Sequence, residues 1–548
     1  MKPRLLRSGY GNPLKFVLIA FSCGALSSLS GGSSGVEQDD SPAPLTVPKA
    51  TCGAEDHPET ALQGQVPAAL RAAGFQGFNC NVQLVGQSRG DGANWQTTEF
   101  RDEHHHVCAY HGTSFSTANR THLGVPVIDI TEPEAPTPTG YLTTTSMLDP
   151  WESLKVNERR QLLAADNGHN GGGGPEVDIY DVSADCRTPQ LLASVQVGKA
   201  DGTTGLPHPV IGHEGSWAPD GMTYYGGDLR YKYTVPGSMA TASGQYYAVD
   251  TADPTHPALI TSWTTGIPGS NVHGMSISDD GNRGYFVSIG GLGASPADLT
   301  DPSKPANNGL LIYDLSEIQA RMPNPQVRLV SKLLWKDGSV AQHTIAVKID
   351  GHPYVIFVDE AGSGGLSGPA QEQAACAAGM PPFPMARIID IRDETKPKIV
   401  SRLALEIHNP ANCSKVLPDL VGLSIFTYGS HYCSVDNRHH ATTLACGYFN
   451  SGIRVFDIRN PHRPKEIAYY NPAGETAASP GSNHLRAGGW VAGGPDWCSA
   501  QVHLRISEEH GRQGTLWTTC QDNGLLMLKF ERGVWPFEDS STPPGQQN

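Results

Sequence analysis

The sequence predicts an all-β protein, a seven-bladed β-propeller in which every blade is a four-stranded antiparallel sheet. Two observations lead to this fold class. With 62 Gly, 42 Pro and 17% charged residues, the composition suits many turns and short strands rather than helices. A short apolar phrase that ends in Asp also recurs roughly every 50 to 75 residues. A strand-rich repeat of that length is typical of propeller blades, and seven of them can close a ring.

The repeated phrase is the predicted third strand of each blade. Six copies contain the Asp, and the seventh has Lys529 at that place. The copies are residues 126–130, 177–182, 246–250, 311–315, 387–391, 454–458 and 524–530.

The fourth repeat shows a whole blade. An Asp-Gly hairpin turn is expected at 279–282 between its first two strands. The four predicted strands are residues 272–278, 283–289, 310–315 and 327–334. Insertions between second and third strands, expected to crowd one rim, are residues 168–174, 294–308 and 362–384. The best helix candidate in the chain, residues 67–74, is short.

The seventh repeat lacks an apolar fourth strand after Phe530, which would leave one blade with an open edge. Residues 80–86 alternate between apolar and polar and precede the first blade. We therefore expect a strand within residues 79–88 to complete blade seven from the N-terminal side. The propeller domain is predicted to span residues 79–535, followed by a disordered tail at 536–548.

Residues 1–30 have the pattern of an export signal, with basic residues before a short apolar run at 16–21 and small residues after it. The run is too short to span a bilayer comfortably. An extracytoplasmic location is expected: secreted, periplasmic or on the cell surface. Cys23 loosely fits a lipoprotein cleavage box, so a lipid anchor there is the one membrane attachment left open. Residues 31–78 are predicted to be a tether and N-terminal segment, flexible up to about residue 48.

Ten cysteines remain when Cys23 is set aside, and an even number in an exported chain predicts a disulfide framework. Two pairs fall on the first and second strands of one blade, and three are paired by proximity in sequence. The expected bridges are Cys433–Cys446, Cys498–Cys520, Cys52–Cys80, Cys108–Cys186 and Cys376–Cys413.

The net charge of −15 argues against a nucleic-acid binder and against docking on anionic lipid. No nucleotide cofactor is expected either, because Gly171–Gly174 is followed by Pro175 and a strand rather than by a helix. The expected partner is a protein, a glycan or a small molecule at the propeller mouth, bound by a monomer.

Histidines recur where the inner strands are predicted to begin. Aligning each strand by its alternating apolar residues places one polar side chain in this position in each of blades one to six, whereas blade seven has Val502 there. The set is His106, Glu152, His213, His273, His343 and His431 for blades one to six, with His503 beside the equivalent position in blade seven. Because inner strands run side by side around the central channel, these side chains are expected to converge near one mouth.

Two interpretations of this set stay open. Imidazole and carboxylate are ligands for copper, iron, zinc or manganese, so the set predicts a transition-metal site. Alternatively, a histidine at the start of a strand can bond a backbone carbonyl or the recurrent Asp of its own blade, in a purely structural network. Glu152 favours the metal-site interpretation, because a carboxylate cannot donate the hydrogen bond that a neutral histidine donates.

The recurrent phrases and the Pro pairs downstream of them resemble the LVIVD repeat family over roughly residues 100 to 530. The resemblance implies a propeller fold but no particular activity. The sequence thus predicts an exported LVIVD-type propeller with a His-rich axial metal site that acts as a binding or scaffold module. The alternative is a metal-dependent oxidoreductase that uses the axial His/Glu cluster.

Overall fold

The structure is a computed structural model, and all statements below concern the residues that it describes. These are 46–89, 95–112, 121–168, 174–198, 206, 210–229, 244–292, 294–366, 368–423, 425–474, 494–507, 513–531 and 533–534. The predicted export signal, Cys23, the first part of the tether and the C-terminal tail lie outside them.

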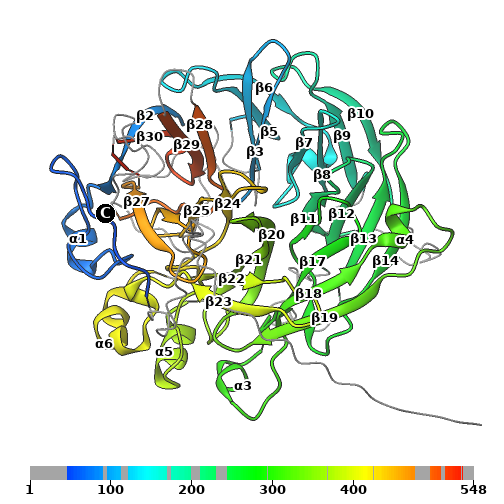
Figure 1. Ribbon diagram of the computed structural model, residues 1–548. Helices are drawn as coiled ribbons and strands as arrows, with labels where there is room; N and C mark the ends of the chain where they lie inside the picture. The colour runs from blue at the N-terminus through cyan, green and yellow to red at the C-terminus, as the bar shows by residue number, and fades with distance from the viewer. Residues whose placement is uncertain are drawn as a thin grey trace, which may run out of the picture. The chain divides into compact units, whose positions relative to one another are not determined.

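The described strands form seven antiparallel sheets arranged as the blades of a propeller (Figure 1), which confirms the predicted fold class. Blades one to three are β3 (Thr97–Arg101), β4 (Val107–His111), β5 (Val125–Asp129) and β6 (Thr137–Leu142); β7 (Lys155–Asn157), β8 (Leu162–Asp166), β9 (Val177–Asp181) and β10 (Gln190–Val195); and β11 (Gly212–Trp217), β12 (Thr223–Asp228), β13 (Gln245–Asp250) and β14 (Ala258–Trp263).

Blades four to seven follow in the same order from the inner strand outward. They are β15 (Ser270–Asn271) with β16 (Met275–Ile277), β17 (Arg283–Gly290), β18 (Asn308–Asp314) and β19 (Arg328–Trp335); β20 (Ser339–Ile349), β21 (His352–Ala361), β22 (Ala386–Asp390) and β23 (Lys398–Arg402); β24 (Cys433–Val435), β25 (Thr443–Gly447), β26 (Ile453–Asp457), β27 (Lys465–Asn471) and β1 (Phe78–Cys80); and β28 (His503–Ser507), β29 (Gln513–Cys520), β30 (Gly524–Phe530) and β2 (Val82–Ser88).

The helices are short. They are α1 (Ala68–Ala73), where the sequence predicts one, α2 (Thr145–Leu148), α3 (Pro296–Thr300), α4 (Ser316–Gln319), α5 (Pro369–Ala377) and α6 (Cys413–Val416), with 3₁₀ turns at Glu406–His408, Pro410–Asn412 and Leu417–Leu420. Two of the predicted rim insertions contain α3 and α5, which contact each other. None of the described helices is long and apolar enough to cross a membrane.

The recurrent Asp ends the third strand of its blade and shapes the turn that follows. In all six copies its side-chain oxygen accepts the backbone N–H of the residue two positions on, at 2.8–3.0 Å; the residues are Asp129, Asp181, Asp250, Asp314, Asp390 and Asp457. This is an Asx turn, for which Asp is well suited. The recurrent Asp is therefore explained by this turn. Of the two partners left open for the inner-strand histidines, His273 and His431 bond the backbone carbonyl.

The ring closes with an N-terminal strand, as predicted. β2 pairs antiparallel with β30 as the outer strand of blade seven, from Val82 opposite Phe530 to Ser88 opposite Leu525. The pairing shifts at a bulge before Gly86, where a Cβ atom would lie 2.0 Å from the carbonyl oxygen of Pro133. The preceding strand β1 adds a fifth strand to blade six, which the repeat pattern does not indicate.

The N-terminal segment from residue 46 onward is docked rather than loose. Val47 is buried, and its N–H donates to the Ala404 carbonyl at 2.8 Å. Farther along, the buried guanidinium of Arg454 pairs with both Glu59 and Glu466, at 3.0 Å for Glu466. The flexible tether expected up to residue 48 thus ends earlier, because this segment covers blades five and six.

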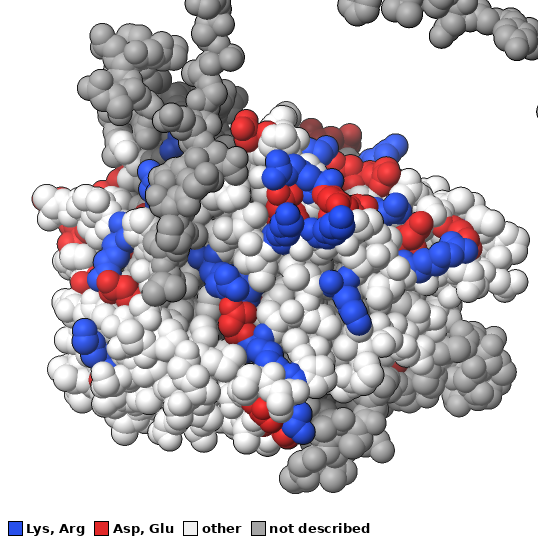
Figure 2. Space-filling view, turned by 60° about the horizontal axis from the view of Figure 1, so that its bottom comes forward, with Lys and Arg blue, Asp and Glu red and all other residues white. Residues whose placement is uncertain are grey.

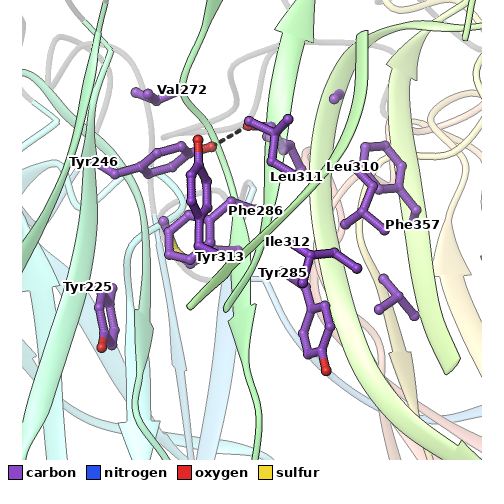
Figure 3. Packing of buried hydrophobic residues seen from close by; sticks show 14 of the residues in the cluster. Tyr225, Tyr246, Val272, Tyr285, Phe286, Leu310, Leu311, Ile312, Tyr313 and Phe357 are labelled. Atoms are coloured by element: carbon purple, nitrogen blue, oxygen red, sulfur yellow. Dashed lines mark hydrogen bonds between the residues drawn. The ribbon is translucent and has the colours of Figure 1, made fainter. Parts of the chain in front are cut away.

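Aromatic side chains pack adjacent blades together. Tyr246 of β13, Phe286 of β17 and Tyr313 of β18 meet edge to face (Figure 3), with ring centroids 4.6 Å and 5.6 Å apart. Such rings bury large apolar areas between neighbouring sheets. All five predicted disulfides are present, which further fixes the blades and the N-terminal segment.

Candidate metal centre on the propeller axis

Four of the predicted residues meet at the inner strands. The Glu152 carboxylate lies at the centre, with its Oε2 atom 3.2 Å from Nε2 of His213 and 2.9 Å from Nε2 of His273. Its other oxygen, Oε1, lies 3.2 Å from Nε2 of His431. All four side chains are buried. Blades two, three, four and six therefore contribute one ligand-type group each to a single cluster.

A fifth group, Glu360, completes the cluster from the end of β21. Its Oε1 atom is 3.3 Å from Nε2 of His431, so that this nitrogen faces two carboxylates. Glu360 is not among the residues that strand alternation predicts. It follows a run of apolar residues in the second strand of blade five, where a buried charged residue is itself a mark of a polar site.

Backbone carbonyls hold two of the imidazole rings in place. Nδ1 of His273 is 2.9 Å from the Ala341 oxygen, and Nδ1 of His431 is 2.8 Å from the Ser499 oxygen. A carbonyl can only accept, so each Nδ1 carries the proton and each Nε2 is directed at the carboxylates. A ring held through its second nitrogen in this way is the usual arrangement of a metal-binding histidine.

Burial and these contacts shift the pKa values of the cluster residues. Burial disfavours the charged form of His431, but the hydrogen bonds with Glu152 and Glu360 outweigh it and raise the pKa of His431 to about 10. The pKa of His273 is also raised, because the charge of Glu152 outweighs burial. Burial lowers the pKa of His213. For Glu152, burial is outweighed by His213 and His273, which hold its pKa well below the ordinary value. Without a metal, therefore, the surroundings favour a protonated His431 ring beside a charged Glu152 carboxylate.

An aromatic group covers the cluster on the side from which the inner strands start. Its members are Trp95, Trp151, Phe426, Phe449 and Trp497. The Trp95 ring lies 5.0 Å from the His431 ring, and the Trp151 ring lies 4.8 Å from the His213 ring.

Four of these aromatic residues have the left-handed backbone conformation, with φ values of 61°, 51°, 55° and 47° for Trp95, Trp151, Phe426 and Phe449. This conformation is unfavourable for bulky side chains by roughly 1–3 kcal/mol each and concentrates at functional sites. The aromatic group keeps bulk water away from this side of the cluster. No sequence pattern indicates it.

Farther along the inner strands, on the other side, lies a cavity of about 570 Å³ that none of the five cluster residues lines. The cavity is lined by residues that follow the cluster residues along the inner strands, among them Lys155, Glu214, Met275 and Tyr432. Lys155 Nζ lies 3.3 Å from Oε1 of Glu214. The cluster thus has an apolar cover on one side and a polar cavity on the other.

His343 does not join the cluster, although the strand alternation predicts it. β20 has a bulge between Ala341 and His343, so that Gln342 is an extra residue in the strand. An insertion of one residue moves a side chain to the opposite face. His343 consequently lines the cavity, and its ring stacks on Tyr432 at 4.5 Å.

His503 and His106 also lie elsewhere. His503 starts β28, where its Nε2 is 2.9 Å from the Thr97 hydroxyl, and it lines the cavity. His106 lies in the turn between β3 and β4, with Nδ1 3.0 Å from Asp102. Its alignment was wrong because the more apolar second strand, β4, was taken for the inner one. In the true register Trp95 precedes β3 as His431 precedes β24.

Comparisons with solved structures find similarity at low sequence identity. The chain resembles a periplasmic gluconolactonase from Pseudomonas aeruginosa (12% identity over 77% of this chain and 95% of that one, TM-score 0.46). It also resembles hydrazine synthase from Kuenenia stuttgartiensis (12%, 81% and 97%, 0.43) and a hypothetical selenium-binding protein from Sulfolobus tokodaii (12%, 76% and 83%, 0.43). No protein-family model and no curated protein matches the chain, so the LVIVD resemblance stays a prediction.

Proposed function

We propose that the protein is an exported propeller that binds a transition-metal ion on its axis through Glu152, His213, His273 and His431. The observation that carries the proposal is the position of His273 and His431. Each has Nδ1 on a backbone carbonyl and Nε2 on a carboxylate. Such a ring must either hold an extra proton or share its Nε2 with a cation. Five disulfides support the oxidising compartment in which an exported protein folds.

The spacing of the cluster is close to what a divalent metal requires. In a tetrahedral site, ligand atoms about 2.0–2.2 Å from the metal lie about 3.3–3.6 Å apart, a few tenths of an ångström more than the 2.9–3.2 Å between Glu152 and the three rings. A metal ion needs a deprotonated Nε2, so metal binding would replace the proton that the surroundings favour on His431.

The donor types narrow the choice of metal. Imidazole nitrogen with carboxylate oxygen suits iron, copper, zinc or manganese, whereas calcium and magnesium prefer oxygen alone. His213, His273 and Glu152 by themselves form a set of two histidines and one carboxylate. His431 approaches the second oxygen of the same carboxylate, where it can bind the metal or orient Glu152.

Elemental analysis of the purified, untagged protein tests the proposal. We expect about one transition-metal ion per chain, and less than a tenth of that in the His213→Ala/His273→Ala double variant. The matched control is His256→Ala/His462→Ala, which removes two exposed imidazoles away from the cluster and should keep the metal. A folded wild-type protein without metal, even after refolding with each of the four candidate ions, would contradict the proposal.

A single variant separates the observed cluster from the predicted set of residues. His343→Ala is expected to leave the metal content unchanged, because His343 lines the cavity and does not contact Glu152. His431→Ala is expected to lower it at least tenfold. Equal losses in both variants, measured by the same elemental analysis, would show that the bulge at Gln342 does not place His343 as described.

A metal-dependent oxidoreductase is the second candidate function, and the cavity next to the cluster favours it. The two histidines and one carboxylate of the Glu152, His213 and His273 set leave coordination positions for an outside ligand, as redox and hydrolytic metal sites require. Electron paramagnetic resonance of the purified protein tests this alternative. Copper or iron that changes its oxidation state with ascorbate would support it, and a site filled only by zinc would exclude it.

A further inference from the structure

We infer that the axial cavity beside the metal centre binds a small hydroxycarboxylate anion. Three hydrogen-bond donors, on Lys155, His343 and Tyr432, line the cavity together with one unused carboxyl oxygen, on Glu214. The inference rests on the proposed function for the ligand's role next to a metal. The binding itself depends on these four side chains and can be measured without metal.

Three of the four side chains carry a buried polar atom that no other described residue satisfies. These atoms are the Tyr432 hydroxyl, Nδ1 of His343 and Oε2 of Glu214. The residues are only 1%, 4% and 1% exposed. A buried polar group without a partner costs about 1–3 kcal/mol. Three such atoms on side chains that line one cavity favour a polar ligand there.

The protonation of His343 follows from its one backbone contact. The N–H of Cys433 donates to its Nε2 at 3.4 Å. Nε2 is therefore an acceptor, and the neutral ring carries its hydrogen on Nδ1, the unsatisfied atom. Because His343 stacks on Tyr432 with the rings only 18° from parallel, the two donors belong to one wall of the cavity.

Lys155 supplies the positive charge that an anionic ligand requires. Its ammonium lies 5.3 Å from the centre of the Tyr432 ring and 3.3 Å from Oε1 of Glu214, and its side chain is 20% exposed. An ammonium, an N–H and an O–H on adjacent walls are suited to the two oxygens of a carboxylate.

The acidic residues of the cavity restrict the ligand further. Glu99, Glu158 and Asp436 also line it, against Arg438, so the cavity would repel a phosphate dianion more strongly than a monoanion. Burial raises the pKa of Glu214 to about 8, so its unused Oε2 can exchange a hydrogen bond with a hydroxyl group as acceptor or as donor. These features together favour a monocarboxylate with a hydroxyl group near the carboxylate.

Calorimetric titration of the metal-free protein with lactate tests the inference at constant ionic strength. Lactamide, which lacks the charge, and propionate, which lacks the hydroxyl, are the paired ligands. We expect lactamide to bind at least tenfold more weakly than lactate, and propionate about threefold more weakly. Two results would overturn the inference. One is equal affinity for lactate and lactamide, and the other is no detectable lactate binding, either at 50 times the protein concentration or at 100 mM.

Variants locate the site. Lys155→Met should weaken lactate binding at least tenfold, and Tyr432→Phe, which removes only a hydroxyl, threefold to tenfold. The matched control Lys348→Met removes a charge outside the cavity lining and should change the lactate affinity less than twofold. Unchanged affinity in Tyr432→Phe and Lys155→Met would contradict the site. Since the titration needs no metal, a protein that lacks metal but binds lactate would overturn only the proposed function.

Discussion

A chain that starts at residue 91, and so lacks the N-terminal segment with β1 and β2, is expected not to fold at 25 °C. Without β2, the apolar strand β30 becomes an open edge. Without Glu59, the fully buried Arg454 loses one of its two carboxylate partners. Breaking a buried ion pair costs about 3–5 kcal/mol, and whole domains are stable by only about 5–15 kcal/mol.

Circular dichroism and thermal melting measure this effect. The control is a chain that starts at residue 46 and keeps every described residue, including Val47 and its bond to blade five. It should give a cooperative transition, whereas the shorter chain should show none. Melting temperatures within a few degrees of each other would mean that the ring closes without β2, against the observed pairing with β30.

The fold could be predicted from the sequence because each blade repeats the same local chemistry. The Asx turn after the third strand of blades one to six requires an Asp at a fixed place, as at Asp314 and Asp390. The missing fourth strand of blade seven then pointed to the alternating residues before blade one. Both features are local, and neither depends on side-chain packing.

The candidate site could be predicted only in part, because the register of a strand can shift without a sequence mark. Glu152, His213, His273 and His431 were found by alternation, which holds in their blades. His343 has the same alternation, but the bulge at Gln342 separates it from the cluster. Glu360 comes from a second strand and could not be found by aligning inner strands.

The surface charges do not point to a nucleic-acid partner. Figure 2 shows basic and acidic side chains next to one another on the face in view rather than a single basic patch. Several are paired, such as Arg392 with Asp390 at 2.6 Å and Arg402 with Asp337 at 2.7 Å. The absence of a nucleic-acid partner stays a prediction. The polar cavity is the feature of this molecule that is suited to a small ligand.

Replacing the central carboxylate, Glu152→Gln, is expected to destabilise the metal-free protein by about 3–5 kcal/mol near pH 6, because it leaves buried imidazolium groups without their counter-charge. The pH dependence follows from the shifts. The pKa of His431 is raised from 6.5 to about 10, so its stabilising contribution is complete below pH 6.5 and is lost as the pH rises through about 10. The pKa of Glu152 is lowered from 4.5, so its contribution is complete above pH 4.5 and is lost at lower pH.

The effect of Glu152→Gln should therefore be largest between about pH 4.5 and 6.5 and smaller at pH 10, where the wild type has itself lost part of the His431 contribution. Urea midpoints at pH 6 and pH 10, with chelator present, measure the difference. Glu158→Gln is the matched control, since Glu158 is exposed and should change stability by less than about 0.5 kcal/mol. A penalty for Glu152→Gln that is the same at both pH values would show that His273 and His431 are neutral without metal. The short distances between the Nε2 atoms and the carboxylates would then need a cause other than protonated rings.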